Sequence, residues 1–284
     1  MAEKLALASE SEETRSGTDW WGEARGIFWL VLAVLGFHSL VAKPFYIPSE
    51  SMMPTLLVGD RLVVSKYPYG YSYVTPTFHI LPFMQGRLFG SLPERGDIVI
   101  LTPTDARSDY IKRVIGLPGD TVEMYGGILY LNGRQVQREK LGIRALKVDS
   151  NLTCDKDHYP GALGRNAAGE LVCNVEIVRE TLPNGKSYDT IDIGPTRADN
   201  FPAVRIPAGH VWLMGDNRDN SADSRMSQAQ LGLGGAVPVE NIGGRAEFIT
   251  FSLDGSASWN PLSWAGSFRS GRAGTSLHPD SAAQ

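Results

Sequence analysis

A serine and a lysine far apart in the sequence have surroundings that favour catalytic chemistry. Ser51 lies between Pro48 and Pro54, and each proline fixes its own φ and disfavours helix at the residue before it. A short, stiff, irregular segment of this kind suits a side chain that must be held out for reaction. Lys112 lies within residues 109–120, an apolar segment with strand character that ends in a Leu-Pro-Gly-Asp turn.

The two side chains together could form a nucleophile and its base. A lysine buried in an apolar strand has a lowered pKa, because burial disfavours the charged ammonium form. A neutral lysine can act as a general base toward a serine hydroxyl. The alternative is that Lys112 extends its stem to solvent and that Ser51 is an ordinary surface serine. The residues alone leave both interpretations open.

A polar loop supplies side chains that could support such a pair. An apolar strand predicted at 210–214 runs directly into a loop rich in hydrogen-bonding groups, among them Asp216, Asn217, Arg218, Ser221, Asp223 and Arg225. Donors and acceptors complement one another there, which predicts a self-satisfied network. The arginines and the irregular carboxylate spacing argue against a metal site. We expect Asp223 to pair with Arg225 or Arg218 and to hold Ser221 in place.

A histidine base is the competing hypothesis for the serine. His210 begins the strand before the polar loop, and the other histidines are scattered at positions 38, 79, 158 and 278. The chain contains no G-x-S-x-G nucleophile elbow. The residues therefore favour lysine over histidine.

An apolar run near the N-terminus precedes these residues. Residues 26–42 carry no formal charge and reach the short end of what spans roughly 30 Å of hydrocarbon, with aromatic residues on both flanks. We predict an uncleaved transmembrane helix there, after a polar cytoplasmic tail at 1–25. A cleaved signal peptide is the alternative, but the preceding region is long and acidic, and no convincing small-x-small site follows. Positive residues flank both sides, so charge does not decide the orientation.

The rest of the chain predicts a mainly β protein. Apolar strands separated by turn residues recur through a catalytic domain at 43–253. A change of composition and hairpin signals at about 124–202 predict a second β lobe inserted into the catalytic lobe. The segment 254–284 is rich in serine and glycine and contains tryptophans, so it either covers core or rests at the membrane interface.

Composition excludes some functions. The chain has 284 residues, a net charge of −4 and no long basic run or aromatic-interleaved basic patch, which argues against nucleic-acid binding. Cys154 and Cys173 are the only cysteines, and they either form a disulfide in an oxidising compartment or stay reduced. Only His158 lies near them, which disfavours zinc. We expect no metal and no cofactor.

Four segments of the chain together resemble the bacterial type I signal peptidases, also called leader peptidases. These segments are 48–56, 95–99, 110–120 and 215–225, and they match the conserved boxes of that family in order and in residue identity. The resemblance extends over roughly residues 27–253.

This resemblance implies a role for each candidate residue. Ser51 would be the nucleophile and Lys112 the general base, with Ser221 orienting the lysine. The Ser49 hydroxyl would help to form the oxyanion hole, beside the backbone N–H of Ser51. The supporting network would comprise Asp216, Asn217, Arg218, Asp223 and Arg225. The implied fold is a signal-peptidase-like β catalytic lobe with an inserted second β lobe.

The resemblance also implies a reaction and a location. The reaction is removal of N-terminal signal peptides from exported preproteins after small residues, by a serine endopeptidase without metal or cofactor. The implied partners are signal peptides, the lipid bilayer and the secretion translocon. The implied location is the bacterial inner membrane, with a single pass and the catalytic domain on the periplasmic side.

Two features depart from the family pattern. Many members carry two N-terminal membrane segments, whereas this chain has one, and the loop at 226–236 beside the site is longer. Two other functions stay open from the residues. A self-cleaving Ser/Lys repressor-type protease would need a DNA-binding domain where the membrane segment lies. A non-enzymatic membrane-anchored β-domain, such as an assembly factor, would not need Ser51 or Lys112.

Overall fold

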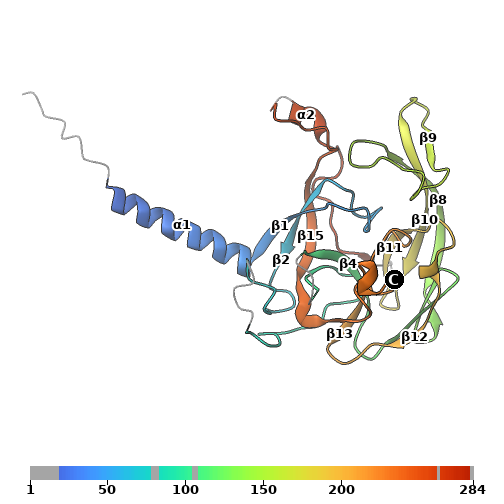
Figure 1. Cartoon of the computed structure of the whole chain (residues 1–284), viewed down its shortest axis with the longest axis horizontal. Helices are drawn as coiled ribbons and strands as arrows, with labels where there is room; N and C mark the ends of the chain where they lie inside the picture. The colour runs from blue at the N-terminus through green and yellow to red at the C-terminus, as the bar shows by residue number, and fades with distance from the viewer. Residues whose placement is uncertain (1–18, 78–82, 104–107, 261–262, 282–284) are drawn as a thin grey trace, which may run out of the picture.

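The computed structural model describes residues 19–77, 83–103, 108–260 and 263–281. A long N-terminal helix extends away from a body built almost entirely of β-strands (Figure 1). This arrangement confirms the predicted mainly β fold with an apolar helix before it.

Helix α1 (Trp20–Leu40) begins earlier than the predicted 26–42 segment and ends before its last residues. Asp19 explains the start, because its carboxylate accepts a hydrogen bond from the Gly22 backbone N–H at 3.0 Å and caps the helix. None of its residues is buried against the body. Within the described ranges, α1 is the one helix that is long and apolar enough to cross a membrane.

The largest sheet has seven antiparallel strands in the order β1-β2-β15-β3-β4-β13-β14. Its strands are β1 (Ala42–Tyr46), β2 (Asp60–Ser65), β15 (Ile242–Ser252), β3 (Ile98–Leu101), β4 (Tyr110–Gly116), β13 (His210–Met214) and β14 (Val237–Pro238). In β4 every residue after Tyr110 is buried, on both faces of the strand. Lys112 therefore lies in the interior, paired with Val99 of β3.

Two smaller sheets come mainly from the part of the chain expected to form the inserted lobe. One sheet contains β16 (Asp280–Ser281), β11 (Lys186–Ile191), β10 (Leu171–Thr181) and β8 (Gln137–Lys147), with β9 (Leu163–Arg165) also on β10. The other contains β12 (Phe201–Arg205), β5 (Thr121–Tyr125), β6 (Ile128–Leu131) and β7 (Arg134–Gln135). Short helical segments lie at Arg197–Asp199, Gln228–Gln230, Val239–Asn241 and, as α2, at Trp264–Ser267.

The segment around Ser51 joins two hydrophobic cores. Met52 is fully buried in a cluster with residues of β2, β3 and β15. Met53 is fully buried in a second cluster, which contains residues of the inserted region and the disulfide between Cys154 and Cys173. Consecutive methionines thus anchor the segment in both parts of the molecule.

The C-terminal segment covers core and also exposes aromatic rings. Leu277 is buried in the same cluster as Met52, and the chain then adds β16 to the sheet of the inserted region. Trp259 and Phe268 remain exposed. The segment therefore ties the two parts of the body together.

Candidate active site

Ser51 lies in the turns between β1 and β2 and is 7% exposed. Its Oγ atom is 3.4 Å from the Ser49 Oγ atom. Its carbonyl oxygen accepts a hydrogen bond from the Asn217 backbone N–H at 3.1 Å. Among the described residues, none accepts a hydrogen bond from the backbone N–H of Ser51. That N–H and the Ser49 hydroxyl are both available as donors near the serine.

Lys112 reaches this serine from the buried strand β4. Its Nζ atom is hydrogen-bonded to Ser51 Oγ at 2.8 Å, and the residue is 3% exposed. Burial lowers the pKa of Lys112 to about 8, although the charges of Asp223 and Asp216 oppose that change. A hydroxyl within hydrogen-bond reach of an amine with such a pKa can lose its proton to that amine.

Gly215 allows the polar loop to approach the serine closely. A Cβ atom at this position would lie 2.2 Å from Ser221 Oγ and 2.4 Å from the carbonyl oxygen of Ser51. Only glycine fits between these two groups. Ser221 is buried, and its Oγ atom has no hydrogen-bond partner in the part of the chain that the structure describes. The expected contact in which Ser221 orients Lys112 is therefore not formed in this structure.

Asp223 and Arg225 form a fully buried ion pair at 2.9 Å. Asp223 also accepts a hydrogen bond from the Gly215 backbone N–H at 3.0 Å. Burial acts to raise the pKa of Asp223, but Arg225 and the hydrogen bonds outweigh it and lower this pKa. Of the two partners expected for Asp223, the structure has Arg225.

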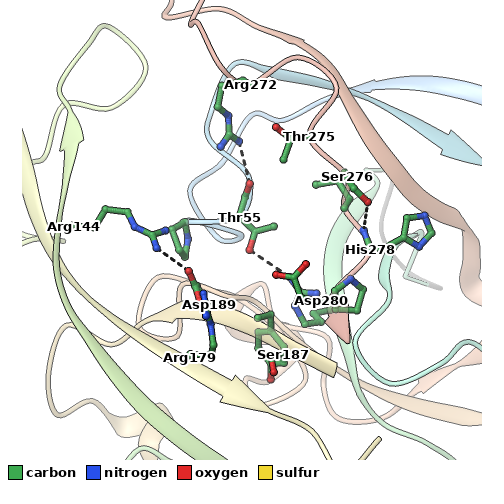
Figure 2. A pocket seen from close by; sticks show the side chains of 15 residues that line it. Thr55, Arg144, Arg179, Ser187, Asp189, Arg272, Thr275, Ser276, His278 and Asp280 are labelled. Carbon is green, nitrogen blue, oxygen red and sulfur yellow. Dashed lines mark hydrogen bonds and ion pairs between the residues drawn. The ribbon is translucent and has the colours of Figure 1, made fainter. Parts of the chain in front are cut away.

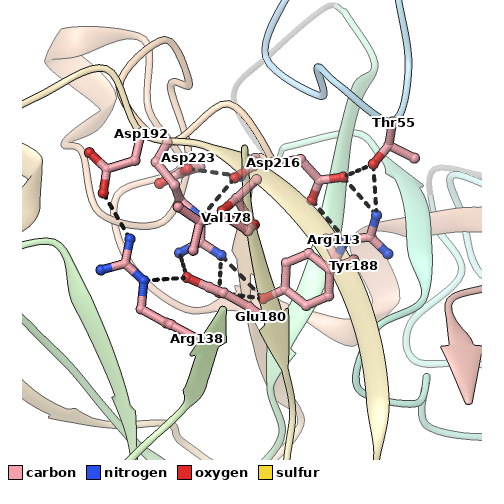
Figure 3. Close-up of polar contacts among 12 residues, drawn as sticks. Thr55, Arg113, Arg138, Val178, Glu180, Tyr188, Asp192, Asp216 and Asp223 are labelled. Carbon is pink, nitrogen blue, oxygen red and sulfur yellow. Dashed lines mark hydrogen bonds and ion pairs between the residues drawn. The ribbon is translucent and has the colours of Figure 1, made fainter. Parts of the chain in front are cut away.

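Arg218 instead binds Glu180 of strand β10, at 2.6 Å. Asp216 likewise has a partner that sequence reasoning missed, because it pairs with Arg113 of β4 at 2.6 Å (Figure 3). Arg113 was recognisable as the residue on the opposite face of the strand from Lys112. No sequence pattern indicated Glu180 as the partner, because it lies in the inserted region, far in sequence from Arg218.

A cavity of about 480 Å³ lies next to this network (Figure 2). Thr55 and Arg113 line it, together with charged residues of the inserted region and of the C-terminal segment. Arg272 of that segment donates a hydrogen bond to the Thr55 carbonyl oxygen at 3.0 Å. This contact joins the C-terminal segment to the turn that follows Ser51. Neither Ser51 nor Lys112 lines the cavity.

The described histidines lie elsewhere. His210 binds the carbonyl oxygen of Ala208, His158 binds Asp155 and His278 binds Glu247. None of the described histidines hydrogen-bonds Ser51, and His79 lies outside the described residues. Among the described residues, no cluster of three His, Cys, Asp or Glu side chains could hold a metal.

Known proteins match most of this chain. Residues 20–251 match the family described as "Signal peptidase, peptidase S26". The signal peptidase I of Rickettsia akari (strain Hartford) is 33% identical over 258 residues, which cover 86% of this chain and 85% of that protein. The signal peptidase I of Rickettsia typhi is 34% identical over 232 residues, covering 78% and 77% respectively. The chain belongs to the signal peptidase family, peptidase S26.

Family membership makes the chain a hydrolase of the signal peptidase class. A crystal structure of a signal peptidase I from Enterococcus faecalis V583 is 22% identical, covering 55% of this chain and 97% of that one, with a TM-score of 0.28. The family assignment therefore rests on the sequence matches.

Proposed function

We propose that the chain removes signal peptides from exported preproteins with Ser51 as nucleophile and Lys112 as general base. The observation that carries the proposal is the 2.8 Å contact between Lys112 Nζ and Ser51 Oγ inside the protein. Burial lowers the pKa of Lys112 to about 8, so that a useful fraction is neutral near physiological pH. Relatives named signal peptidase I support the substrate class.

The proposed reaction begins with transfer of the Ser51 proton to neutral Lys112. The Ser51 oxygen bonds to the carbonyl carbon of the small residue at the end of the signal peptide, which gives a tetrahedral oxyanion. When the C–N bond breaks, Lys112 returns the proton to the leaving amine. A water molecule then attacks the acyl carbon while Lys112 takes its proton. When the bond from that carbon to Ser51 Oγ breaks, Lys112 returns the proton to Ser51.

Two donors would stabilise the oxyanion. They are the Ser49 hydroxyl, which lies 3.4 Å from Ser51 Oγ, and the backbone N–H of Ser51. Loss of one donor of this kind typically costs about 3–4 kcal/mol of transition-state stabilisation. Ser221 would serve a later stage, because its unpartnered hydroxyl beside Gly215 could accept a hydrogen bond from the protonated lysine.

The buried ion pairs would keep the base uncharged. Asp216 and Asp223 each raise the pKa of Lys112, but both carboxylates are bound by arginines. Arg225 also lowers the pKa of Lys112 directly. Residues Asn217 and Arg218 complete the support, through the Ser51 carbonyl and Glu180 respectively.

We infer that helix α1 anchors the body to the bacterial inner membrane. Its exposed apolar surface and its length support a single pass. The Cys154–Cys173 disulfide favours an oxidising compartment, so the body would lie on the periplasmic side and residues 1–25 in the cytoplasm. The substrate's cleavage site would then meet Ser51 near the membrane surface, where the translocon delivers it.

The test is cleavage of a synthetic preprotein by the purified full-length protein in detergent. We expect cleavage after a small residue by the wild type and none by Ser51→Ala, because no other described hydroxyl contacts Lys112 Nζ. Mass spectrometry of the products identifies the cleaved bond. Cleavage by Ser51→Ala at the wild-type rate would contradict the proposed nucleophile.

A further inference from the structure

Glu50, the residue before Ser51, is held through both its side chain and its backbone. Its Oε2 atom accepts hydrogen bonds from Tyr159 Oη and from Asn220 Nδ2, each at 2.9 Å. Its carbonyl oxygen accepts a hydrogen bond from Asn217 Nδ2 at 3.2 Å. The same Asn217 amide donates to Tyr159 Oη at 3.0 Å. These contacts restrain rotation about the bonds that lead to Ser51.

Tyr159 belongs to the loop that the disulfide closes, between Cys154 and Cys173. Its side chain is 1% exposed and packs in one cluster with both cysteines and with Met53. Its hydroxyl lies 3.9 Å from the sulfur of Met53. The inserted region therefore contacts the chain on both sides of Ser51, at Glu50 through a hydrogen bond and at Met53 through packing.

The Tyr159 hydroxyl stays protonated and can act as the donor. Burial raises its pKa, and the negative charge of Glu50 raises it further. A hydrogen bond from a neutral hydroxyl to a carboxylate is shorter and stronger than one between neutral groups. Loss of this bond would leave the Glu50 carboxylate held by Asn220 alone, while leaving the packing of the Tyr159 ring in place.

We propose that Tyr159 is a positioning residue, which acts through Glu50 to hold Ser51 Oγ within reach of Lys112. The inference rests on the proposed role of Ser51 as nucleophile. Glu50 and Ser51 share a peptide bond, so a rotation of Glu50 moves the serine relative to Lys112 Nζ, now 2.8 Å from Ser51 Oγ. Proton transfer is sensitive to that distance.

The first test is Tyr159→Phe, which removes only the hydroxyl. We expect kcat for preprotein cleavage to fall about tenfold with KM nearly unchanged, because the change misplaces the nucleophile and not the substrate. Tyr69→Phe is the matched control, since Tyr69 is also buried and donates to a carboxylate, that of Asp97 at 2.7 Å. It should lose similar thermal stability but keep the wild-type kcat.

A double-mutant cycle tests whether the effect passes through Glu50. We expect Tyr159→Phe to lower kcat in the wild type and to have little further effect in Glu50→Ala. Glu50→Gln should retain more activity than Glu50→Ala, because its amide oxygen still accepts a hydrogen bond. Additive losses in the cycle, or equal kcat for Tyr159→Phe and Tyr69→Phe, would overturn the proposal.

A second readout separates this proposal from the proposed substrate. Acylation of Ser51 by an activated p-nitrophenyl ester, followed by mass spectrometry of the Ser51 peptide, needs a positioned serine but no signal peptide. If the wild type fails to cleave preprotein and Tyr159→Phe still acylates more slowly than Tyr69→Phe, the positioning role stands and the substrate assignment fails. Equal acylation rates of these two variants would remove the positioning role.

Discussion

Two buried lysines of this protein differ in what their amines contact. Lys112 and Lys66 are 3% and 4% exposed, and burial is the largest cause that lowers the pKa of each to about 8. Lys112 Nζ lies 2.8 Å from the hydroxyl of Ser51. Lys66 Nζ lies 5.8 Å from the centre of the Phe45 ring, and among the described residues it has no hydrogen-bond partner.

The difference shows that a lowered pKa by itself does not distinguish Lys112, the proposed base, from Lys66. Burial makes both amines available as bases near neutral pH. Only Lys112 has a hydroxyl within reach and a set of buried ion pairs around it. The hydroxyl of Ser51, the proposed nucleophile, and not the pKa, therefore distinguishes Lys112 from Lys66.

The comparison is tested most strongly by removing each amine. We expect Lys112→Ala to lower kcat for preprotein cleavage by about 10²–10⁴-fold, because a general base is lost. Lys66→Ala should retain kcat within a factor of about two, since its amine contacts no group of the proposed mechanism. Circular dichroism and thermal melting establish that both variants fold. Near-full activity of folded Lys112→Ala would contradict the Ser51–Lys112 pair.

The pH dependence of cleavage sharpens the same comparison. The proposed mechanism requires the neutral form of Lys112, whose pKa is about 8, so activity should rise with pH and level off above that value. Below the pKa, kcat should fall about tenfold for each pH unit as the base protonates. Lys66→Met should not change the pH at which kcat is half of its maximum. A profile that is flat between pH 6 and pH 9, or a midpoint that moves with Lys66, would count against this assignment.

Local patterns predicted much of this site. The prolines around Ser51 indicated an irregular segment. The apolar strand left open whether Lys112 is buried or extends to solvent, and the structure buries it, at 3% exposure. The mainly β fold also followed from the turn residues. The pair Asp223–Arg225 was one of two expected pairings, because the partners lie two positions apart in a single loop.

Contacts between distant segments could not be predicted. Glu180 binds Arg218, and Tyr159 binds Glu50, only because the inserted region packs against the catalytic sheet in one particular register. No local pattern in a single sequence predicts how these two distant regions pack against each other. The start of α1 was missed for a local reason. The uncharged apolar run begins only at residue 26, after Glu23 and Arg25, whereas the cap at Asp19 decides where the helix begins.

The smallest expected effect is on the free energy of unfolding, and it again differs between Lys66 and Lys112. The pKa of each lysine falls from 10.5 to about 8 on folding, so the folded state binds fewer protons than the unfolded state. The resulting cost, about 3 kcal/mol at about 1.4 kcal/mol for each pH unit, is complete below pH 8 and disappears above pH 10.5.

Lys66→Met should therefore raise the free energy of unfolding at pH 7, and the gain should shrink toward pH 10. Lys112→Met should gain less, because it also loses the hydrogen bond to Ser51, which contributes roughly 1 kcal/mol. Guanidinium denaturation of the full-length variants in detergent, at pH 7 and pH 10 and referred to the wild type, measures both gains. If the gain in the free energy of unfolding is the same at pH 7 and pH 10, it comes from packing. The predicted cost of burying the charged amines would then be wrong.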